Sequence, residues 1–443
     1  MTTGMRRREF LGAAGAAGSV LWIPAPSAFT YLQNNKLRIA AVGAGGRAAG
    51  DIDGVRSENI VALCDVDQNR LDKKAAQFPE AKKYADYRKM IEECAKEIDA
   101  VVVGTPDHNH ACPAAMAIKL GKHVYVEKPL THDVFEARTL RELAAKHKVV
   151  TQMGNQGTAS GGLRRGVEVL RAGTIGTIKE IHVWTNRPVW PQAPDIMTRP
   201  PSKPVPPHLN WDCWIGPAPY RDYHDSLHDF RWRGWIDFGT GALGDMACHT
   251  MNLPFHGAQL TAPVSVEAEA GDVNKETWPS WAKVKYEFPA RGTLPPVTLY
   301  WYEGKKNRRD RVLPPADFLH GEKWSDSGSL VVGTKGVLFS GGDYGDHWKL
   351  LPAKDFEGYQ PPPETLPRSP GHHAEWIRAC KGDKIQPMSN FENAGPLTEF
   401  VLLGNVAILL GKKILWDAKA CKVTNAPEAA PLINRPYRKG WTL

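Results

Sequence analysis

Several common signatures are missing from this sequence of 443 residues. Its seven cysteines include no C-x-x-C pair and no spacing typical of a metal site, and their odd number argues against a framework in which every cysteine is paired. No internal repeat is visible. The apolar stretch 11–23 is too short and too rich in glycine to cross a membrane. A metal-binding module, a disulfide scaffold, a repeat protein and a membrane span are therefore not indicated.

A large excess of charge of one sign is also absent. Lysine and arginine number 56 and aspartate and glutamate number 48, so the formal net charge is +8. The one dense basic run, 305–311, is typical of a solvated loop and would attract an anionic sugar. We expect a soluble enzyme with a small-molecule substrate and no nucleic-acid partner.

The amino-terminal segment predicts export. Arg7 and Arg8 precede the apolar stretch 11–23, which is the pattern of a twin-arginine signal; the alternative is a frayed basic amino terminus. We expect residues 1–35 to be a signal and linker, with cleavage near Ala28, and the mature protein to be periplasmic. Because that compartment supplies no free nucleotide cofactor, any cofactor of an exported protein should be held tightly and regenerated in place.

A glycine-rich turn follows the first apolar strand. Residues 36–42 predict a buried strand that leads into Gly43–Ala48, whose sequence G-A-G-G-R-A fits the pattern G-x-G-x-x-A at the start of a helix. The first glycine permits the tight turn, the second admits backbone to a pyrophosphate, and Ala48 lets the helix pack on the strand. The phosphates would then bind at the helix amino terminus, so the turn predicts a dinucleotide site.

A second strand carries the residue that selects the dinucleotide. Residues 60–64 are apolar and end in Asp65, about twenty residues after the glycines, where a ribose-binding carboxylate is expected. A carboxylate there accepts hydrogen bonds from the ribose 2′-hydroxyl of NAD and repels the 2′-phosphate of NADP. NAD is therefore favoured over NADP, although Arg70 lies close enough in sequence to complicate that preference.

Strands and helices continue to alternate from residue 98 onward. Apolar strands are predicted at 98–104, 123–126 and 149–152, with helices between them. This alternation predicts a doubly wound parallel sheet of the Rossmann type over residues 36–157.

Two loops at the carboxyl ends of these strands carry polar side chains. His108 and His110 follow the strand 98–104, and both cofactor contact and ordinary loop hydrogen bonding remain open for them. Lys128, in Glu127-Lys128-Pro129, follows the strand 123–126 at the edge where open α/β folds bind ligands. Burial and a neighbouring cation lower a lysine pKa enough for proton transfer. The alternative is a surface lysine in a strand-to-helix turn.

The second part of the chain, 158–443, has a different pattern. Polar and apolar residues alternate at 179–184 and 282–288, which predicts strands of a half-buried antiparallel sheet. The proline-rich segment 188–219 predicts an ordered arm without long regular elements. We expect a substrate-binding α+β domain with a large open, mostly antiparallel sheet, and an α/β protein overall.

Tryptophan is concentrated in this second part. None lies between Trp22 and Trp184, although the chain holds fifteen. Aromatic rings beside hydrogen-bonding groups suit a pyranose, because its apolar face stacks on a ring. Trp232 and Arg233 are the best placed to contact substrate or nicotinamide, whereas most other tryptophans are expected to fill a core.

Asp245 and His249 form a pair four residues apart in a predicted helix. This spacing places both side chains on one helix face. Histidine titrates near neutral pH, so His249 is suited to take a proton from an alcohol. The alternative is an ordinary contact on the helix surface.

Together, Gly43–Ala48, Asp65, the loop 105–110 and Glu127-Lys128-Pro129 resemble the Gfo/Idh/MocA oxidoreductases, the glucose-fructose oxidoreductase and inositol dehydrogenase group. The resemblance extends from about residue 37 to the carboxyl terminus and includes 173–176 and 239–249. It implies that Lys128, Asp245 and His249 line the catalytic centre and that the protein is a homo-oligomer paired through its sheets. It names no particular substrate.

The predicted sites fall into three sets. The catalytic set is Lys128, Asp245 and His249, and the substrate set is Trp232, Arg233 and His249. No metal ligand is expected. The cofactor set contains Gly43, Ala44, Gly45, Gly46, Arg47, Asp65, Arg70, Thr105, Pro106, His108, His110, Glu127 and Lys128.

Three functions are compatible with these motifs. The first is an NAD-dependent dehydrogenase that moves a hydride from a sugar or glycoside carbon to nicotinamide. The second is a redox-neutral glycosidase or lyase in which bound NAD oxidises the sugar transiently, as in some relatives of the family. The third is a noncatalytic sugar-binding protein, against which Lys128, Asp245 and His249 argue.

Overall fold

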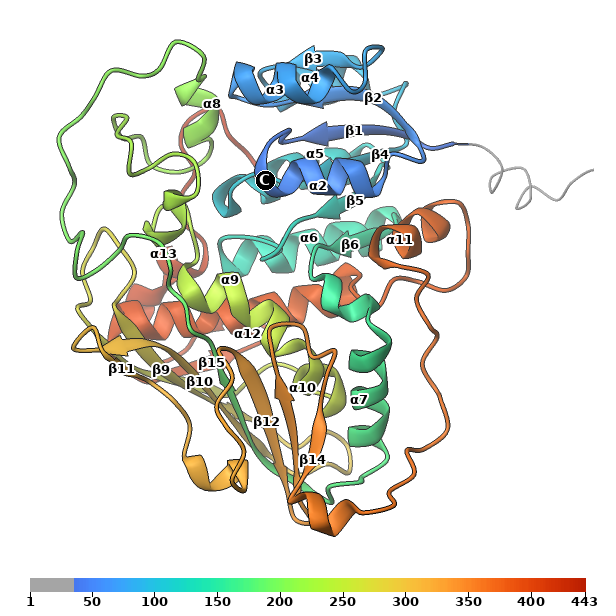
Figure 1. Ribbon diagram of the computed structural model, residues 1–443. Coiled ribbons are helices and arrows are strands. Elements are labelled where there is room, and N and C mark those ends of the chain that lie inside the picture. The colour runs from blue at the N-terminus through green and yellow to red at the C-terminus, as the bar shows by residue number, and fades with distance from the viewer. Residues whose placement is uncertain (1–35) are drawn as a thin grey trace, which may run out of the picture. The chain divides into compact units, whose positions relative to one another are not determined.

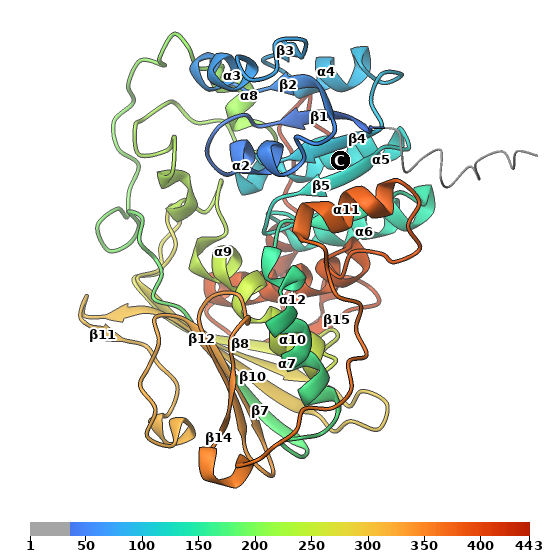
Figure 2. The ribbon, with the colours of Figure 1, turned by 45° about the vertical axis from the view of Figure 1, so that its right-hand side comes forward.

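Two β-sheets organise residues 36–443, the part of the chain that the computed structural model describes (Figures 1 and 2). The predicted signal, with Arg7 and Arg8, lies outside the described residues. The first sheet has six parallel strands in the order β3-β2-β1-β4-β5-β6, the order of a doubly wound nucleotide-binding fold. Its strands are β1 (Arg38–Val42), β2 (Asn59–Cys64), β3 (Lys82–Tyr84), β4 (Ala100–Val103), β5 (His123–Val126) and β6 (Thr151–Met153).

Helices cover both faces of this first sheet. In β1, Ile39 and Ala41 belong to one buried apolar cluster and Ala40 and Val42 to another, as expected for a parallel strand buried on both sides. Side-chain caps start some of the helices; the Asp67 carboxylate, for example, accepts the first free N–H groups of α3. The helices are α2 (Gly46–Gly54), α3 (Gln68–Ala75), α4 (Tyr87–Glu93), α5 (Ala111–Lys119) and α6 (Val134–His147).

The second sheet is large and mostly antiparallel, as predicted. Its main order is β14-β13-β12-β7-β10-β9-β8-β15-β16, β11 pairs with β10, and β7 and β10 are parallel. Buried and half-buried residues alternate along β9, which confirms the half-buried strand expected at 282–288. The strands are β7 (Ile178–Trp184), β8 (Ser265–Gly271), β9 (Trp281–Phe288), β10 (Val297–Lys306), β11 (Asp310–Arg311), β12 (Gly328–Gly333), β13 (Val337–Gly341), β14 (Lys349–Leu351), β15 (Ile414–Asp417) and β16 (Lys422–Val423).

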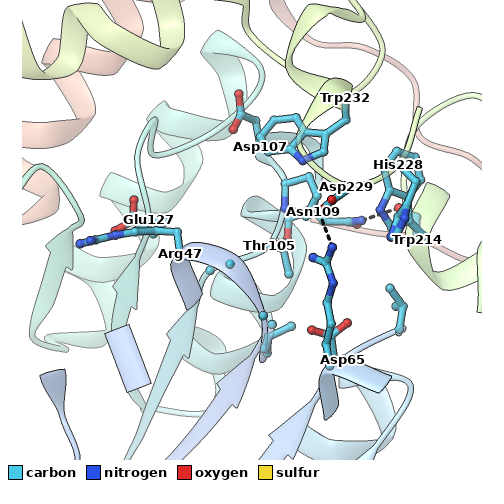
Figure 3. Close-up of a pocket in the computed structure, with 18 of the residues that line it drawn as sticks. Arg47, Asp65, Thr105, Asp107, Asn109, Glu127, Trp214, His228, Asp229 and Trp232 are labelled. Atoms are coloured by element: carbon cyan, nitrogen blue, oxygen red, sulfur yellow. Dashed lines mark hydrogen bonds and ion pairs between the residues drawn. The ribbon is translucent and has the colours of Figure 1, made fainter. Parts of the chain in front are cut away.

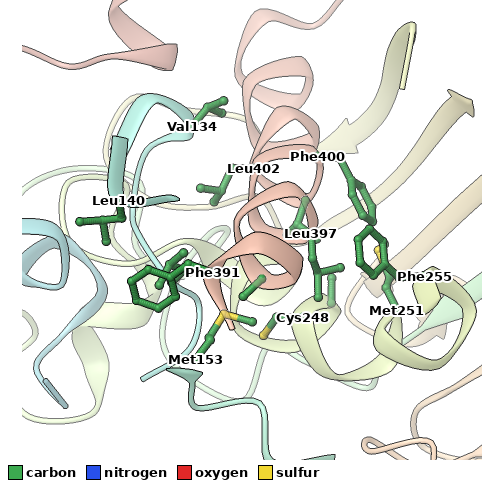
Figure 4. Packing of buried hydrophobic residues seen from close by; sticks show 14 of the residues in the cluster. Val134, Leu140, Met153, Cys248, Met251, Phe255, Phe391, Leu397, Phe400 and Leu402 are labelled. Atoms are coloured by element: carbon green, nitrogen blue, oxygen red, sulfur yellow. The ribbon is translucent and has the colours of Figure 1, made fainter. Parts of the chain in front are cut away.

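The helix α12 (Phe391–Leu410) runs between the two sheets (Figures 1 and 2). It is long and apolar enough to span a membrane by composition, but 78% of its most apolar window is buried within the protein. In Figure 4, Phe400 lies against Phe255, with ring centroids 5.9 Å apart, and Leu402 faces the side of Leu140. This helix is therefore a core element that joins the two sheets.

The remaining helices lie beside one or the other of the two sheets. They are α7 (Gly161–Arg171), α8 (Trp211–Ile215), α9 (Gly241–Thr250), α10 (Asn252–Gly257), α11 (His372–Cys380) and α13 (Ala430–Ile433). Between β7 and α9, residues 185–240 form a long segment whose only regular elements are α8 and a single short 3₁₀ turn, Arg231–Gly234. We call residues 185–240 the arm; its irregular structure fits the high proline content noted for 188–219.

Candidate active site

A cavity of about 350 Å³ lies at the carboxyl edge of the first sheet, between that edge and the arm (Figure 3). This is the crevice where open α/β sheets bind ligands. Trp232 and Arg233 of the arm line it as well. The predicted cofactor residues that line the cavity are Gly43, Gly45, Gly46, Arg47, Asp65, Arg70, Thr105, Pro106, Glu127 and Lys128.

The glycine-rich turn has the shape that a pyrophosphate cradle requires. Gly43 adopts φ +94°, a left-handed conformation that favours glycine, and a Cβ there would lie 3.0 Å from both the Ala48 Cβ and the Gly104 carbonyl oxygen. A Cβ on Gly104 would lie 2.6 Å from the Ala48 Cβ, so the missing side chain at Gly104, opposite the small third residue of the motif, lets α2 approach the sheet. A turn of this shape can accommodate the pyrophosphate of a bound dinucleotide.

Asp65 lines the cavity at the end of β2. Its Oδ2 accepts the Ala44 N–H at 2.7 Å and its Oδ1 accepts the Asp67 N–H at 2.9 Å. Burial raises the pKa of Asp65, and these two N–H groups oppose the rise. Each carboxylate oxygen retains acceptor capacity, so the side chain can hold the turn and still accept a ribose hydroxyl.

Lys128, directly after β5, points at the helix α9. Its Nζ donates to the Asp245 Oδ1 at 2.8 Å and to the Asp245 carbonyl oxygen at 2.8 Å. Burial lowers the pKa of Lys128, but the Asp245 carboxylate together with Cys248 and Glu127 raises it, and the net shift is upward. The expectation of a lowered lysine pKa is therefore wrong, because the nearest charge is an anion; the ammonium stays protonated.

Arg233 supplies a second cation at the same carboxylate. Its Nε lies 3.4 Å from the Asp245 Oδ1, and its guanidinium carbon lies 4.3 Å from the ring centroid of Trp232. Although burial opposes them, Lys128 and Arg233 hold the pKa of Asp245 below its ordinary value. The site thus combines a carboxylate, two cations and an aromatic ring, from β5, α9 and the arm.

His249 lies one turn further along α9 and is buried. Its Nδ1 has no hydrogen-bond partner among residues 36–443, and its ring packs edge-on against Tyr344 at a centroid distance of 5.0 Å. Burial, and next the charge of Lys128, hold the pKa of His249 well below its ordinary value. The imidazole is therefore neutral. Neither Asp245 nor His249 is among the residues that line the cavity.

Glu127, the residue before Lys128, lines the cavity and also belongs to a buried charged cluster with Arg47 and Asp51. Its Oε1 accepts the Arg47 Nε–H at 3.0 Å, and its Oε2 accepts the Lys128 backbone N–H at 3.1 Å. Burial and the nearby Asp51 raise the pKa of Glu127 to about 7. Arg47 therefore binds carboxylates, Glu127 and Asp51, in addition to lining the cavity.

The structure places His108 and His110 away from the cavity. The two ring nitrogens of His108 face the carbonyl oxygens of Phe238 and Trp214, at 3.2 and 2.8 Å. Those of His110 face the carbonyl oxygens of Pro129 and Thr105, at 2.8 Å each. Both side chains are buried and tie the loop to its neighbours, which is the structural alternative left open above.

Several cavity residues were not predicted. Asp107 and Asn109 lie in the same loop as the two histidines, so their position next to the cofactor motif could have marked them. His228, Asp229 and Phe230 come from the arm, more than a hundred residues from the glycine turn. No local pattern signals that they reach the crevice.

Comparison with known families assigns both parts of the chain. Residues 37–155 match a family described as "Oxidoreductase family, NAD-binding Rossmann fold", and residues 181–294 match "Oxidoreductase family, C-terminal alpha/beta domain". The part of the chain that contains the first sheet is thus an NAD-binding Rossmann domain.

Curated relatives resemble part of the chain. Inositol 2-dehydrogenase of Salmonella paratyphi B is 30% identical over 141 residues, which cover 31% of this chain and 40% of that protein. The 1-carboxy-3-chloro-3,4-dihydroxycyclohexa-1,5-diene dehydrogenase of Comamonas testosteroni is 29% identical over 130 residues, 29% of this chain and 32% of that enzyme. The chain therefore spans less than half the length of these two relatives.

Solved structures share the whole fold. The WlbA dehydrogenase from Bordetella pertussis, in complex with NADH and UDP-GlcNAcA, aligns with a TM-score of 0.58 and 17% identity over 86% of this chain and 99% of that one. An inositol dehydrogenase homolog from Azotobacter vinelandii, complexed with NADH and myo-inositol, aligns with a TM-score of 0.57 and 16% identity over 86% and 98% of the two chains. At these identities the alignments show the fold alone.

Proposed function

Since this chain belongs to the Gfo/Idh/MocA family of NAD-binding oxidoreductases, we propose that it transfers a hydride between a carbinol carbon of a cyclic, sugar-like alcohol and bound NAD. The observation that carries the proposal is the arrangement of Lys128, Asp245 and Arg233 beside Trp232, next to a cavity built for a dinucleotide. The curated relatives named above as dehydrogenases of inositol and of a dihydroxylated ring support a cyclic polyol as substrate.

The reaction in the oxidation direction must remove one hydride and one proton from the alcohol. The C–H and O–H bonds break and a C=O bond forms; NAD, held by the glycine turn and Asp65, supplies the hydride acceptor. Lys128 remains an ammonium because Asp245 stabilises its charge, so it stabilises the negative charge that develops on the substrate oxygen. We assign the proton to His249, whose neutral, buried imidazole has an Nδ1 without a partner among residues 36–443, although the side chain does not itself line the cavity.

The ring of Trp232 and the charge of Arg233 favour a ring substrate. Trp232 lines the cavity and Arg233 packs on it, so an apolar sugar face can stack while hydroxyl groups bond to the polar side chains. Most of the other tryptophans fill cores, as expected; Trp184, Trp235 and Trp301 are fully buried.

Absorbance of reduced nicotinamide tests this function. The full-length protein is mixed with NAD and a panel of inositols, pyranoses and glycosides, each present or omitted. A lasting rise that requires one of these alcohols is the expected result. Product without a net rise in absorbance would favour the redox-neutral route over the dehydrogenase. The absence of both product and a rise with every cyclic polyol would contradict the proposed function.

We further propose that the protein is exported folded through the twin-arginine route. The support is the sequence Arg7-Arg8 ahead of an apolar stretch. Replacing both residues by lysine should retain the protein in the cytoplasm, as measured by cell fractionation. Unchanged distribution between the fractions would contradict export by this route.

A further inference from the structure

One side of the cavity is closed by an ion pair between the first sheet and the arm. Arg70, in the first turn of α3, lines the cavity and its Nη2 donates to the Asp229 carboxylate of the arm. The Arg70 Nε also lies 3.4 Å from the Asp67 Oδ2. Because Asp65 marks the ribose end of a dinucleotide site, the pair Arg70–Asp229 lies at the adenosine side of the cavity.

The arm is attached to the first sheet beside this pair, so the contact is not an isolated one. Asp67 and Leu209 form a β-bridge, and the Gln68 N–H donates to the His208 carbonyl oxygen at 2.9 Å. Asp229 has φ +63°, a left-handed conformation that aspartate and asparagine tolerate better than most residues. The arm therefore presents the Asp229 carboxylate to Arg70 from a segment that is itself hydrogen-bonded to the start of α3.

The stem of Arg70 crosses the glycine turn. A Cβ on Gly45 would lie 2.5 Å from the Arg70 Cδ, so the absence of a side chain at Gly45 is what admits the arginine. Around this single guanidinium stand the carboxylates of Asp65, Asp67 and Asp229. The adenosine side of the cavity thus carries more negative than positive charge.

This arrangement bears on the choice between NAD and NADP. The 2′-phosphate of NADP carries close to two negative charges at neutral pH, as phosphomonoesters do, and arginine is the residue that best binds such a group. In Rossmann folds a nearby arginine is the usual partner of that phosphate. Here Arg70 is in the right region but its charge is already shared with Asp229 and Asp67.

We propose that Asp229 is a specificity-determining residue that excludes NADP by occupying Arg70. Asp65 repels the 2′-phosphate directly, and Asp229 withholds the Arg70 guanidinium, which would otherwise offset this repulsion. Discrimination between the two nucleotides then depends on a residue of the arm, 159 positions along the chain from Arg70. The inference rests on the proposed function only in that a nicotinamide dinucleotide occupies the cavity.

The test is the nucleotide content of full-length protein after competition. Protein is equilibrated with equal concentrations of NAD and NADP, freed of unbound nucleotide, denatured, and the released nucleotides are quantified. In Asp229→Asn the ratio of NADP to NAD should rise by about two- to fivefold, the range of an exposed ion pair. The Asp229 side chain is 73% exposed and asparagine tolerates the same φ, so this variant should fold.

Two further variants make the test specific. Asp225→Asn removes the carboxylate of another exposed ion pair in the arm, Lys203–Asp225, which does not line the cavity, and should leave the ratio unchanged. Adding Arg70→Ala to Asp229→Asn should abolish the rise in the ratio of NADP to NAD, because the cation that would bind the 2′-phosphate is gone.

Three outcomes overturn the inference while leaving the proposed function intact. They are an unchanged ratio in Asp229→Asn with NAD still bound, an equal rise in Asp225→Asn, and a gain that persists without Arg70. If the wild-type protein retains neither nucleotide even at saturating concentrations, the proposed function fails instead, since no dinucleotide then binds the cavity.

Discussion

Among the neighbours of Lys128, Asp245 does most to stabilise its charge. Its ammonium bonds to Asp245, whose carboxylate also attracts Arg233, and this arrangement keeps the lysine protonated. A protonated lysine stabilises developing negative charge but does not accept a proton. At the scale of the residue, we therefore propose Lys128 as an electrostatic group and His249 as the proton acceptor.

Replacement of Lys128 separates these two roles. Lys128→Ala should lower kcat about 10²–10³-fold, the usual loss when one group that stabilises an oxyanion is removed. Lys128→Arg keeps the positive charge and should retain clearly more activity than the alanine variant. The measurement is steady-state kinetics with the alcohol that responds best. Equal losses in both variants would favour a proton relay through Lys128.

Replacement of His249 tests the proton acceptor. His249→Ala should lower turnover about 10²–10⁴-fold, the contribution of a positioned general base, without loss of bound NAD. In the wild-type protein the pKa of His249 lies below its ordinary value of 6.5, so the neutral base persists as the pH falls. We expect kcat/KM for alcohol oxidation to stay level from pH 8 down to about 6.5. A fall already complete at pH 7 would assign the base elsewhere.

At the scale of the secondary-structure element, β10 carries a buried carboxyl group. Glu303 is on this strand, and its Oε2 accepts the Trp301 Nε1–H at 2.7 Å. Burial raises the pKa of Glu303 from 4.5 to about 8, because no cation among residues 36–443 pairs with it. The folded protein therefore binds a proton there that the unfolded chain has lost above pH 4.5.

This buried carboxyl predicts a loss of stability with rising pH. A group whose folded pKa is raised contributes stability below its unfolded pKa and loses that contribution as the pH rises through the folded pKa. Between pH 5 and pH 9 the contribution of Glu303 should fall by about 3–5 kcal/mol. Glu303→Gln keeps an acceptor for Trp301 and should remove most of this fall in urea unfolding, whereas the exposed Glu267→Gln should not. The same pH dependence in both variants would contradict the account.

Local sequence patterns predicted the secondary-structure elements well, but they could not predict contacts between residues that are distant in the sequence. Some features depend on neighbours within a few residues or on a fixed spacing, so the sequence could predict them. These are the glycine turn, Asp65 and the alternation in β9. Lys128 and Asp245 are 117 positions apart, and the shared carboxylate that reverses the expected pKa shift is visible only in the fold. The pairing of His108 with backbone carbonyls depends on the arm in the same way.

At the scale of the whole molecule, the arm of the second part covers the cavity of the first. Trp214, His228 and Asp229 of the arm line the same cavity as Gly45 and the rest of the glycine turn. A nucleotide bound there would contact two distant parts of the chain, which favours slow release. Slow release would suit the proposal that the protein is loaded with NAD before export.

Retention of NAD tests that arrangement. The protein purified without added nucleotide should release NAD on denaturation, close to one equivalent per chain. Asp65→Ala should lower this content, because the ribose hydroxyls lose their acceptor. Quantification by chromatography, beside Asp225→Asn as a control outside the cavity, provides the measurement. Release of NADP alone from the wild-type protein would contradict the assignment of Asp65.

Transfer of deuterium tests the central claim most directly. An alcohol that raises the absorbance of reduced nicotinamide is deuterated at its carbinol carbon and mixed with the full-length protein and NAD. The mass of the released nucleotide is then measured by mass spectrometry. Hydride transfer predicts reduced nucleotide that carries the deuterium, and little of it in Lys128→Ala over the same time. Oxidised alcohol with unlabelled nucleotide would contradict direct hydride transfer at this site.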